Sequence, residues 1–286
     1  MKRKPIIVGL GEILWDLLPD GKKAGGAPIN FVYHSSQLGA ESIAISAIGK
    51  DALGDELMEE VKRIKINHLI QRVDYPTGTA EVELKNGIPR FTITEGVAWD
   101  YIPLTTQMEE IVKKTDAICF GTLAQRSPVS RHTILKLLSI APKNSLRILD
   151  INFRQNYYNQ EIIEKSLNLS NVLKVNDEEL VVLCKLFSLD GSEEEKCRWF
   201  IDKFSLKMMI LTAGADYSTL YTSREISRIN TPKVEVVDTV GAGDAFTGAL
   251  ASSLIAGKTI KEAHKFAVET AAFVCTKAGA WPEYEV

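Results

Sequence analysis

The chain has 286 residues, of which 45% are hydrophobic and 25% are charged, a composition typical of globular proteins and unlike disordered or fibrous ones. The 34 Lys and Arg side chains nearly balance the 37 Asp and Glu side chains, and the two signs are interspersed, which argues against a nucleic-acid partner. Acidic residues interrupt the apolar stretch after the basic start, and no stretch reaches the roughly 18 apolar residues of a membrane span. We therefore expect a cytoplasmic protein without a membrane partner.

Short apolar runs alternate with segments of helical periodicity along most of the chain. This alternation predicts repeated βαβ units, and hence an α/β fold whose mostly parallel central sheet is covered by helices on both faces. The expected strands lie at residues 6–8, 43–45, 117–120, 148–151, 172–175 and 208–211.

Two helices have clear end signals. Pro28 suits the first position of a helix and Gly39 the residue just past its end. Thr259 and Glu262 form a T-x-x-E capping box ahead of apolar residues at helical spacing, which predicts another helix starting after Thr259.

Residues 77–101 interrupt the alternation. Strand-like segments at 79–84 and 90–94 flank the turn dipeptide Asn86-Gly87, which predicts a β-hairpin. Such a hairpin is a candidate lid over a site, or a surface hairpin without a role. Because no linker rich in Pro, Gly or Ser divides the chain, we expect one domain over 1–286.

The run Asp-Thr-Val-Gly-Ala-Gly-Asp at residues 238–244 carries most information about chemistry. It lies between a predicted strand at 234–237 and a predicted helix at 245–256. Two glycines at a strand-to-helix turn let the backbone approach a ligand and direct N–H groups at an anion. A carboxylate beside a bound phosphate is useful as a general base, so Asp244 is the candidate base. The alternative is that Asp244 only complements the helix dipole.

This run resembles the signature of the ribokinase-like (PfkB) family of carbohydrate kinases. The resemblance implies a ribokinase-like three-layer fold with a small β-sheet lid, formed here by about residues 12–24 and 77–101. It also implies that Gly241, Ala242 and Gly243 form an anion hole, with Gly241 and Gly243 contacting the nucleotide, and that Asp244 is the catalytic base.

Two further segments resemble the sugar-binding motifs of the family. Gly25-Gly26-Ala27-Pro28-Ile29-Asn30 is similar to its G-G-x-x-x-N signature, and Asp16 matches its sugar-binding acid. The resemblance assigns sugar contacts to Asp16, Gly26 and Asn30, although a glycine pair alone is also an ordinary loop. Arg154, in a D-x-N-x-R segment, is expected to hold the sugar or to neutralise phosphoryl charge.

The remaining motifs concern the nucleotide and metal ions. Residues 176–179 resemble the family's N-x-x-E motif, in which Asn176 positions phosphate and Glu179 acts on Mg²⁺ through water. The alternative, compatible reading is a helix cap by Asn176. Thr212 and Gly214 match a T-x-G segment that lines the nucleotide pocket.

The resemblance implies ATP and Mg²⁺ as cofactors, and K⁺ as a further candidate, with Asp238 and the Val240 carbonyl as its ligands. The motif pattern is most similar to that of fructokinases, so fructose is the expected substrate. A 2-keto-3-deoxygluconate kinase and a non-catalytic sugar-binding regulator are the alternatives. The resemblance also makes a homodimer through the lid an expectation.

Overall fold

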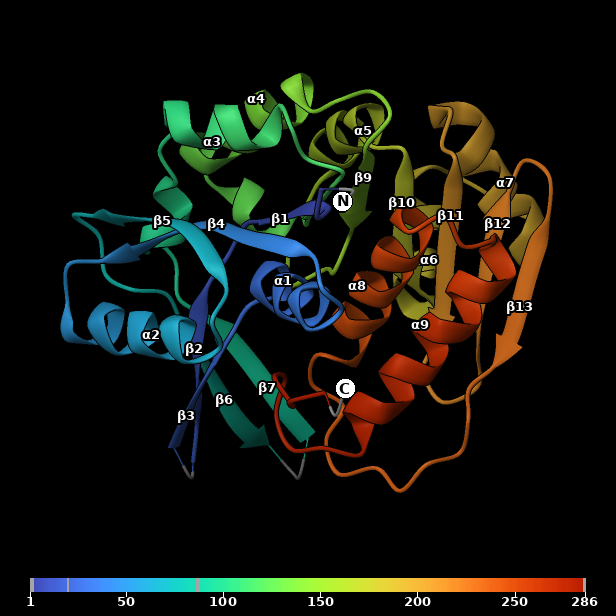
Figure 1. The fold of residues 1–286 in the computed structure, drawn as a ribbon. Coiled ribbons are helices and arrows are strands. Elements are labelled where there is room, and N and C mark those ends of the chain that lie inside the picture. Colours follow the sequence, from blue (N-terminus) through green and yellow to red (C-terminus); the bar gives the residue numbers. More distant parts are fainter. Residues whose placement is uncertain (1–2, 20, 86–87, 285–286) are drawn as a thin grey trace.

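The computed structural model describes residues 3–19, 21–85 and 88–284. They form a nine-stranded sheet in the order β13-β12-β11-β10-β9-β8-β1-β4-β5 and a four-stranded sheet in the order β3-β2-β6-β7 (Figure 1). Neighbouring strands from β5 to β11 are parallel, whereas β12 and β13 pair antiparallel at one edge. The predicted α/β fold with a mostly parallel central sheet is confirmed.

The large sheet consists of β1 (Ile6–Leu10), β4 (Glu41–Gly49), β5 (Asn67–Val73), β8 (Ala117–Phe120), β9 (Leu146–Asp150), β10 (Val172–Asn176), β11 (Met208–Ala213), β12 (Tyr217–Thr222) and β13 (Ile226–Asn230). The small sheet consists of β2 (Leu14–Leu18), β3 (Gly21–Gly25), β6 (Thr79–Lys85) and β7 (Ile88–Ile93). The helices are α1 (Ala27–Gln37), α2 (Ala52–Arg63), α3 (Thr106–Val112), α4 (Pro128–Ile140), α5 (Gln160–Leu169), α6 (Asp177–Leu186), α7 (Glu193–Phe204), α8 (Ala242–Ile255) and α9 (Ile260–Cys275), with short 3₁₀ helices at Ala98–Tyr101 and Leu123–Arg126.

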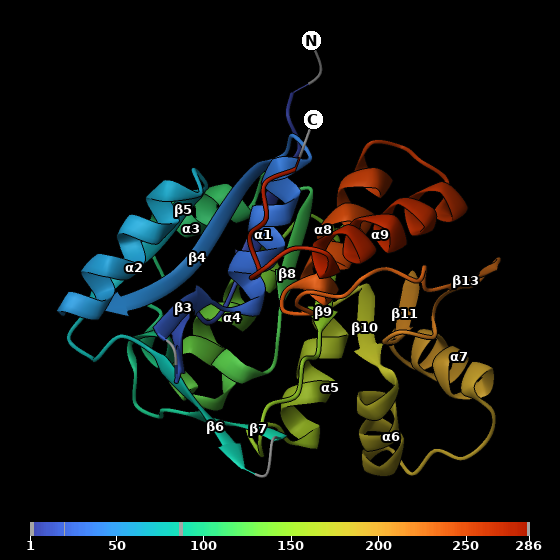
Figure 2. The same cartoon turned by 90° about the horizontal axis from the view of Figure 1, so that it is seen from below.

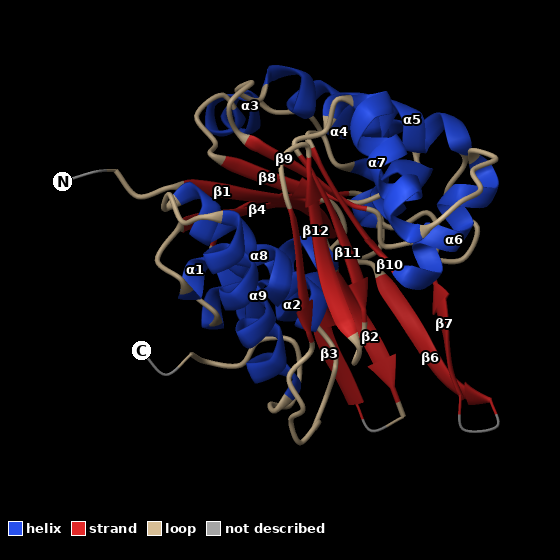
Figure 3. Cartoon of the chain, turned by 90° about the vertical axis from the view of Figure 1, so that its right-hand side faces the viewer, coloured by secondary structure: helices blue, strands red, loops and turns tan. Residues whose placement is uncertain are grey.

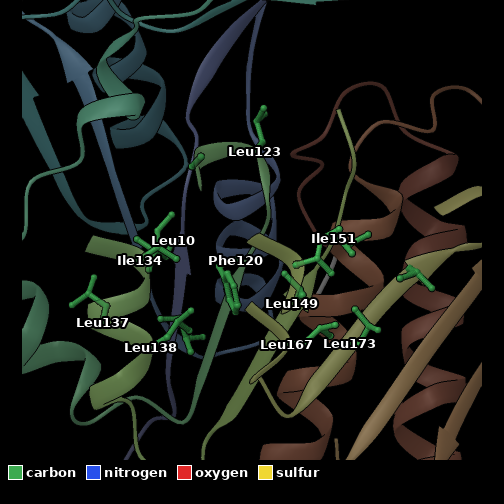
Figure 4. Close-up of a cluster of buried hydrophobic side chains, with 14 of the residues drawn as sticks. Leu10, Phe120, Leu123, Ile134, Leu137, Leu138, Leu149, Ile151, Leu167 and Leu173 are labelled. Carbon is green, nitrogen blue, oxygen red and sulfur yellow. The ribbon is translucent and has the colours of Figure 1, made fainter. Parts of the chain in front are cut away.

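Helices cover both faces of the large sheet, as Figure 3 shows. One face packs against α1, α2, α8 and α9, and the other against α3 to α7, so the molecule has two hydrophobic cores. The second core includes Phe120 and Leu149 from the sheet and Leu138 and Leu167 from the helices above it (Figure 4). The strands of the large sheet are mostly apolar because they are buried on both faces.

The small sheet extends from the end of the large sheet and lies beyond the helical layers (Figures 2 and 3). Its β6 and β7 pair antiparallel, which confirms the predicted hairpin, while the Asn86-Gly87 turn lies outside the described residues. The segment that follows β1 supplies β2, which pairs parallel with β6. Segments more than sixty residues apart in the sequence therefore build one sheet, as the lid prediction requires.

The end signals of both predicted helices are confirmed. Pro28 lies in the first turn of α1, and Gly39 follows its C-cap with a φ of +87°, a conformation that favours glycine. At α9, the Thr259 side chain accepts from the Glu262 N–H and the Glu262 carboxylate from the Thr259 N–H, which is the predicted capping box.

The strand predicted at residues 234–237 is wrong. This segment is a loop that connects β13 to α8 and pairs with no described strand. Val236 and Val237 are mostly exposed. β-Branched residues favour strands, but here they have no buried surface to pack against, so the sequence pattern was misleading. The predicted helix at 245–256 starts earlier, at Ala242, which brings the second glycine of the motif into its first turn.

Among the described residues, no helix is both long enough and apolar enough to cross a membrane.

Trp99 is fully buried in the core, and its indole lies so close to Gly78 that a Cβ on Gly78 would come within 2.2 Å of the ring nitrogen. Trp99 therefore packs beneath the small sheet and does not line the cleft described below.

Candidate active site

A cleft of about 360 Å³ opens between the carboxyl ends of the parallel strands and the small sheet. This is the edge at which ligands bind in open α/β sheets, because loops and helix N-termini converge there. The cleft brings together most of the predicted site residues, namely Asp16, Gly26, Asn30, Arg154, Asn176, Glu179, Thr212, Val240, Gly241, Gly243 and Asp244. Ala242, Gly214 and Asp238 do not line it.

The N-terminus of α8 faces this cleft without a side-chain cap. Gly241 is the N-cap residue and has a φ of +81°, and a Cβ there would lie 3.0 Å from the Cβ of Ala280. The Ala242 N–H donates to the Thr239 carbonyl at 3.3 Å, so this amide is used within the turn. The amides of Gly243 and Asp244 lie in the first helical turn, where N–H groups lack partners within the helix, so they are candidates for binding an anion.

Asp244 is held by a chain of hydrogen bonds that begins at the C-terminal loop. The Trp281 Nε1 donates to the Asn30 Oδ1 at 2.8 Å, and the Asn30 Nδ2 donates to the Asp244 Oδ2 at 2.8 Å. Because the indole can only donate, it fixes which end of the Asn30 amide faces Asp244. The base candidate lines the cleft, and one of its two oxygens is fixed by Asn30.

Burial in the cleft raises the pKa of Asp244 to about 7, and the nearby charge of Asp150 adds to this effect. Lys174, the hydrogen bond from Asn30 and the charge of Arg154 act in the opposite direction. A carboxyl group with a pKa near neutral pH is suited to accept a proton at neutral pH.

A buried ion pair lies beneath the α8 N-terminus. The Lys174 ammonium in β10 donates to the Asp150 Oδ2 at 2.7 Å, and Thr247 of α8 donates to the same oxygen at 3.4 Å. A Cβ on Gly243 would lie 3.4 Å from the Lys174 Nζ, so the ammonium lies beside the turn. Burial opposes the charge of Lys174, but Asp150, together with Asp244 and Glu179, outweighs it and raises the pKa of the ammonium.

Asn176 and Glu179 form a capping box at the start of α6. The Asn176 Oδ1 accepts from the Glu179 N–H at 2.7 Å, and the Glu179 Oε2 accepts from the Asn176 N–H at 2.8 Å. The other carboxylate oxygen of Glu179 accepts from the Phe153 N–H at 3.0 Å, which fixes the loop that carries Arg154. Burial and the charge of Asp150 raise the pKa of Glu179.

The opposite side of the cleft combines polar groups from three segments. Asp16 projects from β2, Gly26 precedes α1, and Arg154 follows β9 on a loop in which Asn152 has a φ of +43°. Burial raises the pKa of Asp16, while the charges of Arg154 and Lys23 oppose the rise. This arrangement offers hydroxyl groups both acceptors and donors.

Asp238 and Gly214, two predicted site residues that do not line the cleft, hold hydrogen bonds within nearby loops. Asp238 accepts from the Val240 N–H and from the Gly279 N–H, each at 3.0 Å, so its carboxylate ties the 238–244 turn to the C-terminal loop. Gly214 lies in the exposed turn after β11, where its carbonyl accepts from Thr231 at 3.0 Å. Thr212, at the end of β11, does line the cleft.

The sequence reasoning missed four residues that the structure brings to this site: Glu12, Asp150, Lys174 and Trp281. For Lys174 the signal was a charge within the otherwise apolar run of β10. For Glu12 and Asp150 it was an acid at or just past the end of a buried strand. Trp281 had no local signal, because its partner Asn30 lies 251 positions away.

The chain is similar to known proteins over almost its whole length. The profile described as pfkB family carbohydrate kinase matches residues 20–284. The sugar kinase PH1459 of Pyrococcus horikoshii is 27% identical over 96% of this chain and 92% of that protein. Its crystal structure in complex with ATP has a TM-score of 0.81, covering 96% of this chain and 94% of that chain. Fructokinase-1 of Oryza sativa subsp. japonica is 27% identical over 98% of this chain and 94% of that protein.

Proposed function

Since this chain belongs to the pfkB family of carbohydrate kinases, we propose that it transfers the γ-phosphate of ATP to a hydroxyl group of fructose, giving ADP and fructose 6-phosphate. The observation that carries the proposal is the position of Asp244 in the first turn of α8, fixed by Asn30 and facing the cleft. The relative of known structure that binds ATP supports the choice of nucleotide. The rice relative supports the choice of sugar.

In the proposed reaction Asp244 accepts the proton of the attacking hydroxyl group as the oxygen bonds to the γ-phosphorus and ADP leaves. The Gly243 and Asp244 amides, aligned with the α8 dipole, stabilise the negative charge of the transferring group. The Lys174 ammonium beside Gly243 adds a fixed positive charge at the same place. Asp16, Gly26, Asn30 and Arg154 are proposed to orient the sugar for in-line attack.

The charges of the cleft favour an uncharged sugar. The described residues lining it include five carboxyl groups, Glu12, Asp16, Asp150, Glu179 and Asp244, but only two cationic side chains, Lys174 and Arg154. Lys174 is already paired with Asp150. A phosphorylated sugar or a sugar acid would bring further negative charge toward Asp16, so these observations favour fructose over 2-keto-3-deoxygluconate.

The Mg²⁺ ion of the proposed reaction is bound to ATP and not held directly by side chains. Among the described residues, no group of three His, Cys, Asp or Glu side chains could hold a metal directly. Glu179 fits a contact through water, because it lines the cleft while both its oxygens already accept hydrogen bonds from backbone amides. Mg²⁺ bound to ATP supplies charge neutralisation on the phosphates. K⁺ at Asp238 and the Val240 carbonyl stays a prediction.

The small sheet is proposed to act as the lid over the sugar, since Asp16 and Leu14 of β2, Ala80 of β6 and Ile93 of β7 line the cleft. Closure would exclude water from the transferring phosphoryl group. The extent of the domain over 1–286 and a homodimer through the small sheet stay predictions.

The test is the release of ADP from MgATP by purified protein with fructose, 2-keto-3-deoxygluconate, fructose 6-phosphate, ribose or glucose. The proposal predicts selective turnover of fructose. Selective turnover of another sugar would reject fructose but keep the kinase. Binding of sugar without turnover of any of them, in the presence of K⁺, would point to the non-catalytic regulator.

A further inference from the structure

Glu12 is a buried acid that the proposed mechanism does not use. It follows β1 after Gly11, is only 5% exposed, and lies on the floor of the cleft. Its Oε2 atom is fully buried and has no hydrogen-bond partner among the described residues. No described Lys, Arg or His lies within ion-pair distance of it. A buried acceptor without a donor is costly, so this oxygen requires explanation.

The backbone fixes Glu12 firmly in this position. Gly26 packs against it so closely that a Cβ at Gly26 would lie 2.5 Å from the Glu12 carbonyl oxygen. Gly26 also has a φ of +129°, which other residues rarely adopt. The two segments that carry the predicted sugar contacts, the strand β2 and the start of α1, are thus joined at Glu12. Glu12 is among the residues that line both the cleft and the recess beside it.

The space in front of Glu12 is small, and its walls are mostly apolar. A recess of about 10 Å³, enough for roughly one water-sized group, adjoins the main cleft. Its walls include Pro28, Cys119 and Phe120, and its polar groups come from Glu12, Asp150, Asn152 and Asp244 among others. Burial raises the pKa of Glu12 to about 7, and the backbone amides of Glu12 and Ala27 and the charge of Arg154 oppose the rise. The recess thus accommodates one oxygen atom that can donate a hydrogen bond.

We propose that Glu12 is a specificity-determining residue whose Oε2 accepts a hydrogen bond from a sugar hydroxyl other than the one that is phosphorylated. The inference rests on the proposed function and adds a contact that none of the sequence motifs assigned. Asp244 receives the attacking hydroxyl from the α8 side, whereas Glu12 reaches the ligand from the β1 side. A sugar that fills the recess supplies the missing donor, and a sugar lacking that hydroxyl leaves the carboxyl group unpaired.

The test is a cycle that combines variants with modified substrates. The quantity measured is kcat/KM of the wild type and of Glu12→Leu with the preferred sugar and with each of its monodeoxy analogues. Leucine is of similar size but has no acceptor. We expect Glu12→Leu to lower kcat/KM for the parent sugar by about 10²-fold or more, as one monodeoxy analogue does with the wild type. The two changes together should cost little more than either alone.

The inference would be overturned if, for every monodeoxy analogue, the loss in kcat/KM from the analogue multiplied with the loss from Glu12→Leu. So would wild-type kinetics of the leucine variant, because the recess would then hold only water. Asp16→Asn is the matched control, since it should couple to a different hydroxyl group. If Glu12→Leu does not fold, as judged by thermal unfolding, Glu12→Gln replaces it, and its amide should relax the discrimination at the same hydroxyl group.

Failure of the proposed function is distinguishable in the same assay. Absence of turnover by the wild type with every sugar would overturn both the proposed function and this inference. Turnover by the wild type without coupling at Glu12 would overturn this inference alone.

Discussion

Asn30 in α1 donates a hydrogen bond of 2.8 Å to Asp244 in α8, across 214 positions of sequence. The bond joins the predicted sugar-binding segment to the predicted base, so binding of sugar and ionisation of Asp244 are physically linked. The Asn30 hydrogen bond lowers the pKa of Asp244 against the effect of burial. The strength of this hydrogen bond therefore helps to set the pH above which Asp244 is deprotonated and can accept a proton.

Trp281→Phe tests this link from a distance. The change removes the only N–H of the ring, which holds the Asn30 carbonyl oxygen at 2.8 Å, and leaves an aromatic ring in place. With Asn30 free to turn, the pKa of Asp244 should rise and kcat should fall by about tenfold. The acidic limb of the kcat/KM profile should move to higher pH.

The matched control is Trp199→Phe, in α7 and outside the cleft. An unchanged pH profile for Trp281→Phe would show that Trp281 only fills space.

The raised pKa of Asp244 also predicts a change in stability with pH. Its pKa is about 7 in the folded protein against an ordinary value of 3.8, so between these pH values the folded state holds a proton that the unfolded state has released. The stabilisation from this carboxyl group is therefore complete at low pH and is lost as the pH rises through 7. Asp244→Asn removes the loss, so the variant should gain Tm relative to the wild type between pH 5 and pH 8.

The Tm of the variant must be compared with that of the wild type at each pH, because His34 and His264 change the stability with pH in the opposite direction. Burial lowers the pKa of His34 to about 3 and that of His264 to about 4. Both histidines are common to the variant and the wild type, and their effect cancels. A difference in Tm that is constant across this range would contradict the raised pKa of Asp244.

Lys174 is predicted to have both a structural and a functional role. Lys174→Met leaves the Asp150 carboxylate buried without its cation, which should lower the free energy of unfolding by about 3–5 kcal/mol. The double change Lys174→Met with Asp150→Leu should restore most of this stability, because well-packed apolar pairs replace buried ion pairs at little cost. Activity should stay low in the double variant, since the positive charge beside Gly243 is still missing.

Denaturant unfolding and ADP release measure the two effects separately. Lys207→Met, at an exposed position before β11, is the control. Recovery of turnover together with stability would reject the functional role of Lys174.

Glu179 and its neighbour Glu178 form a matched pair of acids in the first turn of α6. In Glu179→Gln the amide nitrogen must face one of the two backbone N–H groups that the carboxylate now accepts from. The free energy of unfolding should fall by about 1–3 kcal/mol, and the Mg²⁺ concentration required for half-maximal rate should rise. The exposed Glu178→Gln should change neither quantity. Equal behaviour of the two variants in a Mg²⁺ titration would contradict the role of Glu179.

Local patterns in the sequence were sufficient to predict much of the fold. All six predicted strands belong to the large sheet, since strands buried on both faces read as apolar runs. The edge strand β5 has only Leu69 and Ile70 as adjacent apolar residues, between polar pairs on either side, and gave no such run. At residues 234–237 valines suggested a strand that has no neighbour to pair with, and pairing is a property of the whole fold.

The site shows the same division between local and long-range information. Gly241, Gly243 and Asp244 are adjacent in sequence, so one motif was enough to nominate them. The contacts of Asp150 with Lys174 and of Trp281 with Asn30 join distant segments, and only the folded chain reveals them. Glu12 was visible as an acid after an apolar strand, but its missing partner depends on how Gly26 packs against it.

The central claim is that Asp244 is the base of a sugar kinase. The most direct test is the rate of ADP release from MgATP with saturating sugar, measured for the wild type, Asp244→Asn and the control Asp177→Asn, which makes the same change at an exposed first-turn position of α6. We expect Asp244→Asn to fold and bind sugar but to turn over about 10²- to 10⁴-fold more slowly, while Asp177→Asn behaves as the wild type. Turnover by Asp244→Asn within a few-fold of the wild type would contradict it.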